Sequence, residues 1–254
     1  MKKLMKAVAA IMLMTVVVCI AGCTKPNGPN NGGNDGNGGN NNGGGNNGGG
    51  NGGSINGFEY VDLGLPSGTM WATYNVGATS PEDFGYYFAW GETQPKEKYY
   101  WDTYKWCNGE PKQLTKYCNY AQNGFDGYTD NLIVLQASDD VATDMWGSGW
   151  RMSTHEEWTE LVINTTATWT TLNGVNGTRF TSANGNSIFL PAAGSISFDY
   201  FAFVGEQGYY WSGSLNEGNP QMAWGFYIGS DGCSYNGAYS RCYGYVIRPV
   251  HSAN

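Results

Sequence analysis

Residues 138–162 read SDDVATDMWGSGWRMSTHEEWTELV, and they decide the fold class because they predict two short helices in a chain that otherwise favours strands. In the first helix Ser138 can supply the N-terminal cap, and Gly147 ends it. Asp139 and Asp140 sit in its first turn, where the helix dipole favours negative charge. We interpret this pair as a dipole complement and not as a calcium or acid–base site, since neighbouring helical residues point about 100° apart. The residues expected on its buried face are Val141 and Met145.

The second helix is predicted from its N-terminal boundary. Ser153 or Thr154 begins a capping box that Glu156 or Glu157 completes, which satisfies backbone N–H groups that have no partner inside a helix. Apolar residues then recur at helical spacing, so one face of this helix is expected to be buried. These residues are Trp158, Leu161 and Val162.

Strand-like segments make up most of the chain around these helices. They mix β-branched and aromatic residues and are bounded by Gly, Pro and Asn. Every Trp, Tyr and Phe lies after Asn56, so only this part of the chain has the material for a core. The expected fold class is therefore α+β, with two short helices on a mostly strand-built body. The candidate strands are residues 60–65, 69–73, 187–190, 223–228 and 243–250.

The amino terminus has the pattern of a secretory leader. Lysines precede sixteen uncharged and mostly apolar residues, 7–22, and small residues stand directly before Cys23. The sequence Ile20-Ala21-Gly22-Cys23 resembles a bacterial lipobox, which implies cleavage before Cys23 and lipidation of its thiol. The alternative is an uncleaved anchor, but sixteen residues fall short of the roughly 20 that a membrane span needs. The expected membrane contact is thus the lipid on Cys23.

The residue after Cys23 bears on localisation. Thr24 is not the Asp that resembles an inner-membrane retention signal, so we expect an outer-membrane lipoprotein. Whether the protein faces the periplasm or the cell surface stays open.

A glycine- and asparagine-rich segment follows the leader. Of the 31 residues 24–54, 14 are Gly and 11 are Asn, which leaves too little apolar surface to offset the entropy of ordering the backbone. We interpret this segment as a flexible tether. The predicted organisation is a signal peptide at 1–22, the lipidated cysteine and tether at 23–54, and one folded domain at 55–254.

The charge excludes one class of partner. The formal net charge of the whole chain is -8, and no basic run occurs after the leader. Nucleic-acid binding through phosphate neutralisation is therefore not expected.

Seven short motifs follow one another along the chain. They are YVDLGLPSGTMWA (60–72), FAWGET (88–93), SDDVA (138–142), GWRMST (149–154), NGNSIFLPAAG (184–194), YWSGS (210–214) and VIRPV (246–250). This series resembles a known family, the Fibrobacter succinogenes major paralogous domain of Bacteroidetes lipoproteins. The resemblance implies a C-type-lectin-like fold with two short helices, twisted antiparallel sheets and long loops on one face. Ser153 departs from the proline that is typical of the family's WRMPT motif, although serine also caps helices well.

The most informative segment for function is 229–245, GSDGCSYNGAYSRCYGY. Twelve of its seventeen residues are Tyr, Ser, Gly or Asn, the mixture that antibody loops use, because Tyr gives rigid amphipathic contact area and small residues adapt around it. The segment also resembles the diversified carboxy-terminal segments of proteins targeted by diversity-generating retroelements; the alternative is an ordinary Tyr-rich hairpin. We expect a glycan or surface protein as ligand, with two tryptophans as exposed platforms. The predicted ligand-binding residues are Trp211, Trp224, Asp231, Ser234, Tyr235, Asn236, Tyr239 and Tyr243.

Catalysis and metal binding are not expected. His155 and His251 have no Ser, Cys or Asp at the spacing of a known catalytic signature, so both are predicted to be exposed and non-catalytic. Neither a cofactor nor a metal is expected, because no C-x-x-C spacing supports a zinc site. Four cysteines can form disulfides in an oxidising compartment, and the shortest loops pair the first two and the last two. These are Cys107, Cys118, Cys233 and Cys242.

Two other functions remain as alternatives. In the first alternative the domain is a passive component of a surface assembly. In the second it is an enzyme related to the formylglycine-generating enzymes, whose fold the motif series also resembles. The copper-binding cysteine pair of those enzymes has no obvious counterpart here, which argues against the second.

Overall fold

The computed structural model describes residues 52–252. All pairs of strands within its sheets are antiparallel, and two short α-helices accompany them. The predicted leader, Cys23 and most of the predicted tether lie outside the described residues. The helices are α1 (Val141–Trp146) and α2 (His155–Asn164), with 3-10 turns at Trp101–Thr103, Ala121–Asn123, Phe125–Gly127 and Ala137–Asp139. The strands are β1 (Gly52–Ile55), β2 (Phe58–Asp62), β3 (Met70–Ala72), β4 (Trp150–Met152), β5 (Thr165–Leu172), β6 (Val175–Ser182), β7 (Ser187–Pro191), β8 (Ser195–Ser197), β9 (Tyr200–Ala202), β10 (Gln207–Leu215), β11 (Met222–Gly229), β12 (Gly232–Ser240) and β13 (Pro249–His251).

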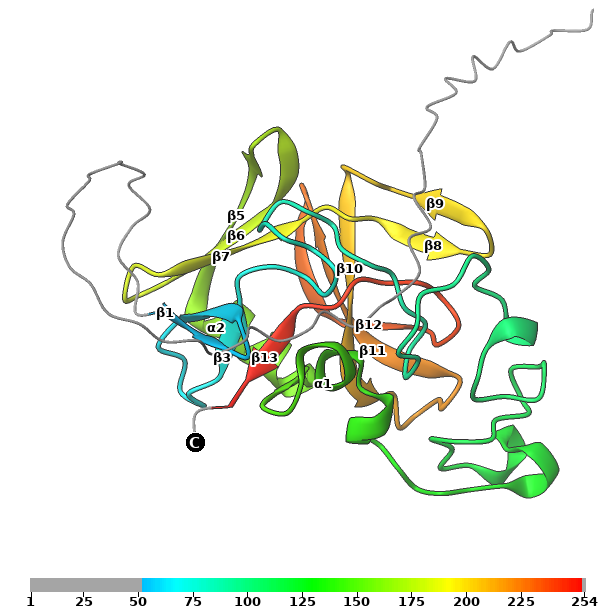
Figure 1. The fold of residues 1–254 in the computed structure, drawn as a ribbon. Helices are drawn as coiled ribbons and strands as arrows, with labels where there is room; N and C mark the ends of the chain where they lie inside the picture. The colour runs from blue at the N-terminus through cyan, green and yellow to red at the C-terminus, as the bar shows by residue number, and fades with distance from the viewer. Residues whose placement is uncertain (1–51, 253–254) are drawn as a thin grey trace, which may run out of the picture. The chain divides into compact units, whose positions relative to one another are not determined.

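The largest sheet joins the two ends of the described chain. Its strand order is β1-β2-β3-β13-β4, so the last strand lies between two strands that come much earlier in the sequence. Val250 pairs with Trp71 on one side and with Arg151 on the other. Figure 1 shows β13 in red beside β3, with α1 close by.

The first strand corrects the predicted end of the tether. Gly52, Gly53 and Ser54 were expected to be part of a flexible coil, but they belong to β1 and pair with β2. A Cβ on Gly53 would stand 2.7 Å from Cζ of Tyr60, so the missing side chain leaves room for that ring. Composition alone missed this strand because backbone hydrogen bonds to β2 hold it, whereas composition reports the apolar side chains available for burial.

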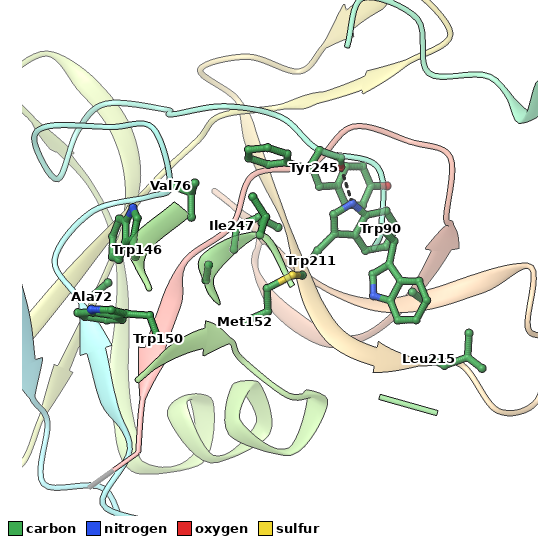
Figure 2. Packing of buried hydrophobic residues seen from close by; sticks show 14 of the residues in the cluster. Ala72, Val76, Trp90, Trp146, Trp150, Met152, Trp211, Leu215, Tyr245 and Ile247 are labelled. Carbon is green, nitrogen blue, oxygen red and sulfur yellow. Dashed lines mark hydrogen bonds between the residues drawn. The ribbon is translucent and has the colours of Figure 1, made fainter. Parts of the chain in front are cut away.

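A second sheet is formed by three strands from the carboxy-terminal half of the domain. Its order is β10-β11-β12, and buried clusters cover both of its faces. On one face α2 packs through Trp158, whose ring stacks on Phe226 at 4.4 Å. On the other face Trp211 stacks on Tyr245 at 4.3 Å. Figure 2 shows Trp211 and Tyr245 together with Trp90 in this cluster.

The first helix begins later than predicted. Ser138 and Asp139 lie in a 3-10 turn before the helix, and Asp140 is the N-cap, whose carboxylate accepts from the N–H groups of Ala142 and Thr143. Gly147 ends the helix as expected, with a φ of 87°. The expected buried face is half wrong, since Val141 is buried but the side chain of Met145 is 40% exposed. The buried face of this helix is instead formed by Val141, Ala142 and Trp146.

The second helix confirms its capping box. Thr154 is the N-cap, its hydroxyl accepts from the N–H of Glu157, and the Glu157 carboxylate accepts from the N–H of Thr154. Trp158 and Leu161 are buried.

The predicted strand at 243–250 is much shorter in the structure. Only Pro249–His251 forms a strand, while Tyr245 and Val246 make isolated bridges to Phe88 and Tyr210. The chain here crosses from one sheet to another, so its backbone changes partners from residue to residue.

Two buried arginines, Arg241 and Arg248, hold the irregular parts of the chain. Arg241 donates to the carbonyl oxygens of Lys116, Tyr117 and Pro220, and to the hydroxyl of Tyr104. These acceptors include residues from the long segment between β3 and α1, which Figure 1 draws in cyan and green and which contains no strand of the sheets. Arg241 therefore ties this segment to the carboxy-terminal half at several points.

The remaining strands form two smaller sheets. One has the order β5-β6-β7, and the other is the hairpin of β8 and β9. Among residues 52–252, no helix is long and apolar enough to span a bilayer.

Candidate functional site

The predicted ligand-binding residues gather around one sheet but not on one of its faces. Asp231 and Asn236 are exposed, while Ser234 and Tyr243 are half-buried. Their positions are Trp211 on β10, Trp224 on β11, Asp231 in the β11–β12 turn, Ser234, Tyr235, Asn236 and Tyr239 on β12, and Tyr243 just after it.

Trp211 is not the exposed platform that we expected. Its side chain is 0% exposed, its Nε1 donates to the carbonyl of Phe88 at 2.9 Å, and its ring stacks on Tyr245. The neighbouring Tyr210 is also buried, because the sheet has a packed cluster on each face. Trp211 therefore belongs to the buried core beneath this sheet.

Three half-buried tyrosines, Tyr209, Tyr227 and Tyr239, form what we call the tyrosine face. The ring centroids of Tyr209 and Tyr227 are 5.6 Å apart, and those of Tyr209 and Tyr239 are also 5.6 Å apart. Tyr239 packs with its edge against Tyr245 at 5.2 Å. The tyrosine face thus rests on the aromatic core below it.

Glycines create the space in which these rings lie. A Cβ on Gly225 would stand 2.9 Å from Cδ2 of Tyr239, and a Cβ on Gly237 would stand 2.5 Å from Cζ of the same ring. A Cβ on Gly229 would stand 2.9 Å from Cζ of Tyr227. The rings therefore lie against the glycine backbone of the sheet, where side chains would otherwise project.

Hydrogen bonds fix two of the three tyrosines. The hydroxyl of Tyr227 donates to Oδ1 of Asp231 at 2.7 Å, and that of Tyr209 donates to Oε1 of Gln207 at 2.7 Å. The Tyr239 hydroxyl has no protein partner in the described part of the chain. Burial, with a smaller contribution from the nearby Tyr209, raises the pKa of Tyr239 to about 12. The face therefore presents neutral hydroxyl groups near neutral pH.

Sequence reasoning missed Tyr209 and Tyr227. The spacing of aromatic and glycine residues identifies Tyr227, because this residue stands two positions from both Gly225 and Gly229. Tyr209 has no such signal. The Tyr227 ring lies over Gly229 of its own strand, and the Tyr239 ring lies over Gly237 of its own strand and Gly225 of the adjacent strand.

The opposite face of the same sheet carries Trp224 and Tyr235. Trp224 is half-buried and stacks on the imidazole of His155 at 4.4 Å, with 24° between the ring planes. Tyr235 lies 6.1 Å from the same imidazole. Burial lowers the pKa of His155, which is half-buried and not exposed as expected. These residues form a second aromatic surface beside α2.

The two acidic residues before α1 have separate structural roles. Asp139 pairs with Lys116 at 2.6 Å and accepts from the hydroxyl of Tyr117, also at 2.6 Å. Asp140 caps α1 and accepts from the N–H of Met152 at 2.8 Å. Burial raises the pKa of Asp140, although these N–H groups oppose the shift. The two carboxylates do not share a site, and Asp139 is an ion-pair partner and not a dipole complement.

All four predicted disulfide cysteines are free thiols in the structure. Neither of the short-loop pairs is bonded in the structure, and the members of each pair lie in different surroundings. Sγ of Cys107 lies 3.0 Å from the carbonyl of Trp101, whereas Sγ of Cys118 lies 3.2 Å from that of Tyr120. Cys233 packs against the cluster beneath α2, and Cys242 belongs to a different cluster.

A second feature that sequence reasoning missed is an exposed apolar segment at residues 198–204, which we call the aromatic hairpin. The exposed fractions reach 71% for Tyr200 and 65% for Phe201. The run FDYFAFV gave the signal, since five large apolar residues within seven positions exceed what one short strand can bury. Its exposed members are Phe198, Tyr200, Phe201, Phe203 and Val204.

The structure contains two notable cavities. One of about 560 Å³ is lined by Trp150, Arg151 and His251, and none of the predicted ligand-binding residues lines it. The other, of about 500 Å³, adjoins the tyrosine face and is lined by Tyr227 and Asp231. Within residues 52–252, no group of three or more His, Cys, Asp or Glu side chains is placed to hold a metal ion.

Comparisons with protein-family models, with curated proteins and with solved structures find no match for this chain.

Proposed function

We propose that this protein is a non-catalytic binding lipoprotein of the outer membrane that recognises a glycan or a surface protein through the tyrosine face. The observation that carries the proposal is the set of three half-buried tyrosine rings that pack together, two of which, Tyr227 and Tyr239, lie on glycines. Tyrosine provides a large amphipathic contact area, and few of its rotatable bonds need to be ordered on binding. Rings that are already packed lose still less conformational freedom when a ligand arrives.

The sequence motifs support the wider proposal. They resemble the Fibrobacter succinogenes major paralogous domain, and we propose a C-type-lectin-like fold on that basis. The sheet-rich α+β architecture with two short helices is compatible with it. The lipobox-like sequence before Cys23 supports attachment through lipid, with the segment after it as a spacer.

The proposal is tested by substitutions on the two faces of one sheet. Tyr227→Ala and Tyr239→Ala are expected to weaken binding of the full chain to a glycan array or to whole bacterial cells by about tenfold each. Tyr235→Ala, on the opposite face, is the matched control and is expected to leave binding unchanged. Melting temperatures show whether each variant is folded.

The control also identifies the alternative surface. If Tyr235→Ala abolishes binding while Tyr227→Ala and Tyr239→Ala do not, the ligand occupies the Trp224 side of the sheet. The assignment of binding to the tyrosine face would then be wrong.

The aromatic hairpin favours a second candidate function, assembly with other copies of this chain. Within the described structure β9 pairs only with β8, so its outer edge has unpaired backbone groups beside exposed aromatic side chains. An apolar strand edge of this kind pairs readily with another strand.

Sedimentation over a range of concentrations tests this assembly. Self-association that Phe201→Ser removes and Tyr86→Ser preserves would support it, since Tyr86 is an exposed aromatic outside the hairpin. A monomer at every concentration would exclude it.

A further inference from the structure

The cavity of about 500 Å³ beside the tyrosine face has the size of a small-molecule site. Three separate parts of the chain line it. Trp169 comes from the β5–β6 hairpin, Glu206 and Gln207 from the turn before β10 and its first residue, and Tyr227 and Asp231 from β11 and the turn after it. The cavity therefore adjoins the proposed binding face, because Tyr227 belongs to both.

Hydrogen bonds hold the walls of this cavity in place. The N–H of Gly205 donates to the carbonyl of Ala192 at 2.8 Å, and Nδ2 of Asn176 donates to the carbonyl of Gly205 at 3.0 Å. The N–H of Gln207 donates to the carbonyl of Phe203 at 2.9 Å. The turn that carries Glu206 is thus fixed to β6 and to the segment after β7 before any ligand binds.

Several polar groups of the cavity have hydrogen-bonding capacity left over. Oε1 of Gln207 accepts from Tyr209, which leaves its amide nitrogen as a donor. One oxygen of Asp231 accepts from Tyr227, which leaves the other as an acceptor. Among residues 52–252, the Glu206 carboxylate has no hydrogen-bond partner in the protein. Free donors and free acceptors therefore lie around one cavity.

This mixture fits hydroxyl groups better than it fits a cation. A hydroxyl group both donates and accepts, so neighbouring hydroxyls of a sugar ring can use the carboxylates and the amide together. An ammonium group only donates and would leave the amide nitrogen of Gln207 unused. The ring of Trp169 adds an apolar surface for the carbon face of a sugar.

Charge restricts the ligand further. Glu206 and Asp231 are both acidic, and no Lys, Arg or His lines the cavity within the described part of the chain. Sialic acids, uronic acids and sulfated sugars would place a negative charge beside two carboxylates. Neutral sugars avoid this repulsion.

We infer that this cavity binds a neutral sugar residue of a glycan whose neighbouring units contact the tyrosine face. The inference rests on the proposed function and names the ligand class for it.

The test uses the full chain on an array of neutral oligosaccharides that end in glucose, galactose or mannose, with matched oligosaccharides capped by sialic acid or sulfate. Binding is expected for neutral sugars and is expected to be at least about tenfold weaker for the capped ones. Glu206→Ala and Trp169→Ala are expected to weaken neutral binding by about tenfold each. Glu217→Ala is the matched control, because it removes an exposed acid from the β10–β11 connection, away from the cavity lining.

Two results would overturn the inference. One is the absence of neutral-sugar binding. If tetramethylammonium chloride then binds saturably and Glu206→Ala removes that binding, the cavity is a cation site and not a sugar site. The other is neutral-sugar binding that both cavity variants leave unchanged.

Tyr239→Ala separates failure of this inference from failure of the proposed function, since Tyr239 does not line the cavity. If only Tyr239→Ala loses binding, the result supports the tyrosine face as the binding surface and contradicts binding in the cavity. If only the cavity variants lose binding, the result supports the cavity and contradicts the tyrosine face. Near-ultraviolet circular dichroism confirms that each variant retains its packing.

Discussion

Gly237 lies on β12 with the ring of Tyr239 where a side chain would otherwise stand. Gly237→Ala is therefore expected to displace that ring and to lower the free energy of unfolding by roughly 1–3 kcal/mol, the usual cost of overpacking. Urea unfolding measures this change. Gly213→Ala is the matched control, because the nearest atoms to its Cβ would be 3.7 Å away, an ordinary contact. Equal stability of the two variants would contradict the glycine-dependent packing of Tyr239.

Arg248 is fully buried and donates to three acceptors in two parts of the chain. Its guanidinium donates to the carbonyls of Ala72 and Phe189 and to Oδ1 of Asn75, each at 2.9 Å. Burial lowers its pKa to about 10. All three acceptors are carbonyl or amide oxygens and none is a carboxylate, so the role of this cation is to join strands and not to form an ion pair.

Arg248→Met is expected to lower the free energy of unfolding by at least about 3 kcal/mol, because it leaves three buried acceptors without a donor. Arg179→Met serves as control, since Arg179 is only half-buried. Thermal or urea unfolding compares the two. A loss for Arg248→Met no larger than that for Arg179→Met would show that these bonds contribute little.

Among the elements, α2 depends on its capping box. Thr154→Ala removes the acceptor for the N–H of Glu157 and is expected to cost about 1 kcal/mol of stability. Thr166→Ala, at an exposed position on β5, is expected to change stability very little. Urea unfolding of both variants is the measurement, and indistinguishable midpoints would mean that tertiary packing alone holds the helix.

Local rules predict α2 well and α1 less well. The capping box of α2 is a short-range pattern, so Thr154 and Glu157 are visible in the sequence. Three consecutive residues before α1 can each act as a cap, and the choice of Asp140 depends on its bond to the distant Met152. Long-range contacts of this kind have no local signature.

The candidate site divides in the same way. The composition of residues 229–245 pointed to the β11–β12 hairpin, which adjoins the tyrosine face. It did not show that Tyr239 and Tyr235 lie on opposite faces, because a register shift between Gly225 and Tyr227 interrupts the pairing with β12. It also did not reveal Tyr209, whose place depends on the β10–β11 register.

For the whole molecule, buried tyrosines make stability sensitive to alkaline pH. Burial is the main cause that raises the pKa of Tyr99, Tyr227 and Tyr239 to about 12 from a usual value of 10, and it raises that of Tyr210 further. The native state keeps these protons at a pH where the unfolded chain has lost them. The free energy of unfolding is therefore expected to be insensitive to these groups below pH 10 and to fall between pH 10 and 12.

Urea unfolding at pH 8, 10 and 11 checks this dependence, with absorbance at 295 nm to follow tyrosinate formation. Stability that is constant across this range would contradict the burial of these hydroxyl groups.

The long segment between β3 and α1 shows the limit of sequence reasoning at this scale. Its residues have no clear periodicity, yet they are ordered because Arg241 and buried rings such as Trp90 and Tyr117 hold them. Arg241 lies 124 positions from Tyr117 in the sequence. No window of neighbouring residues contains that information.

The place of β13 between β3 and β4 has a consequence for biosynthesis. The position between β3 and β4 stays vacant until residues 249–251 are synthesised, so β4 cannot join this sheet before then. A polypeptide that is threaded through a translocation channel must remain unfolded, and late closure would favour that state. A chain that lacks residues 249–251 would leave β3 and β4 without their shared neighbour and would expose the product to proteolytic quality control.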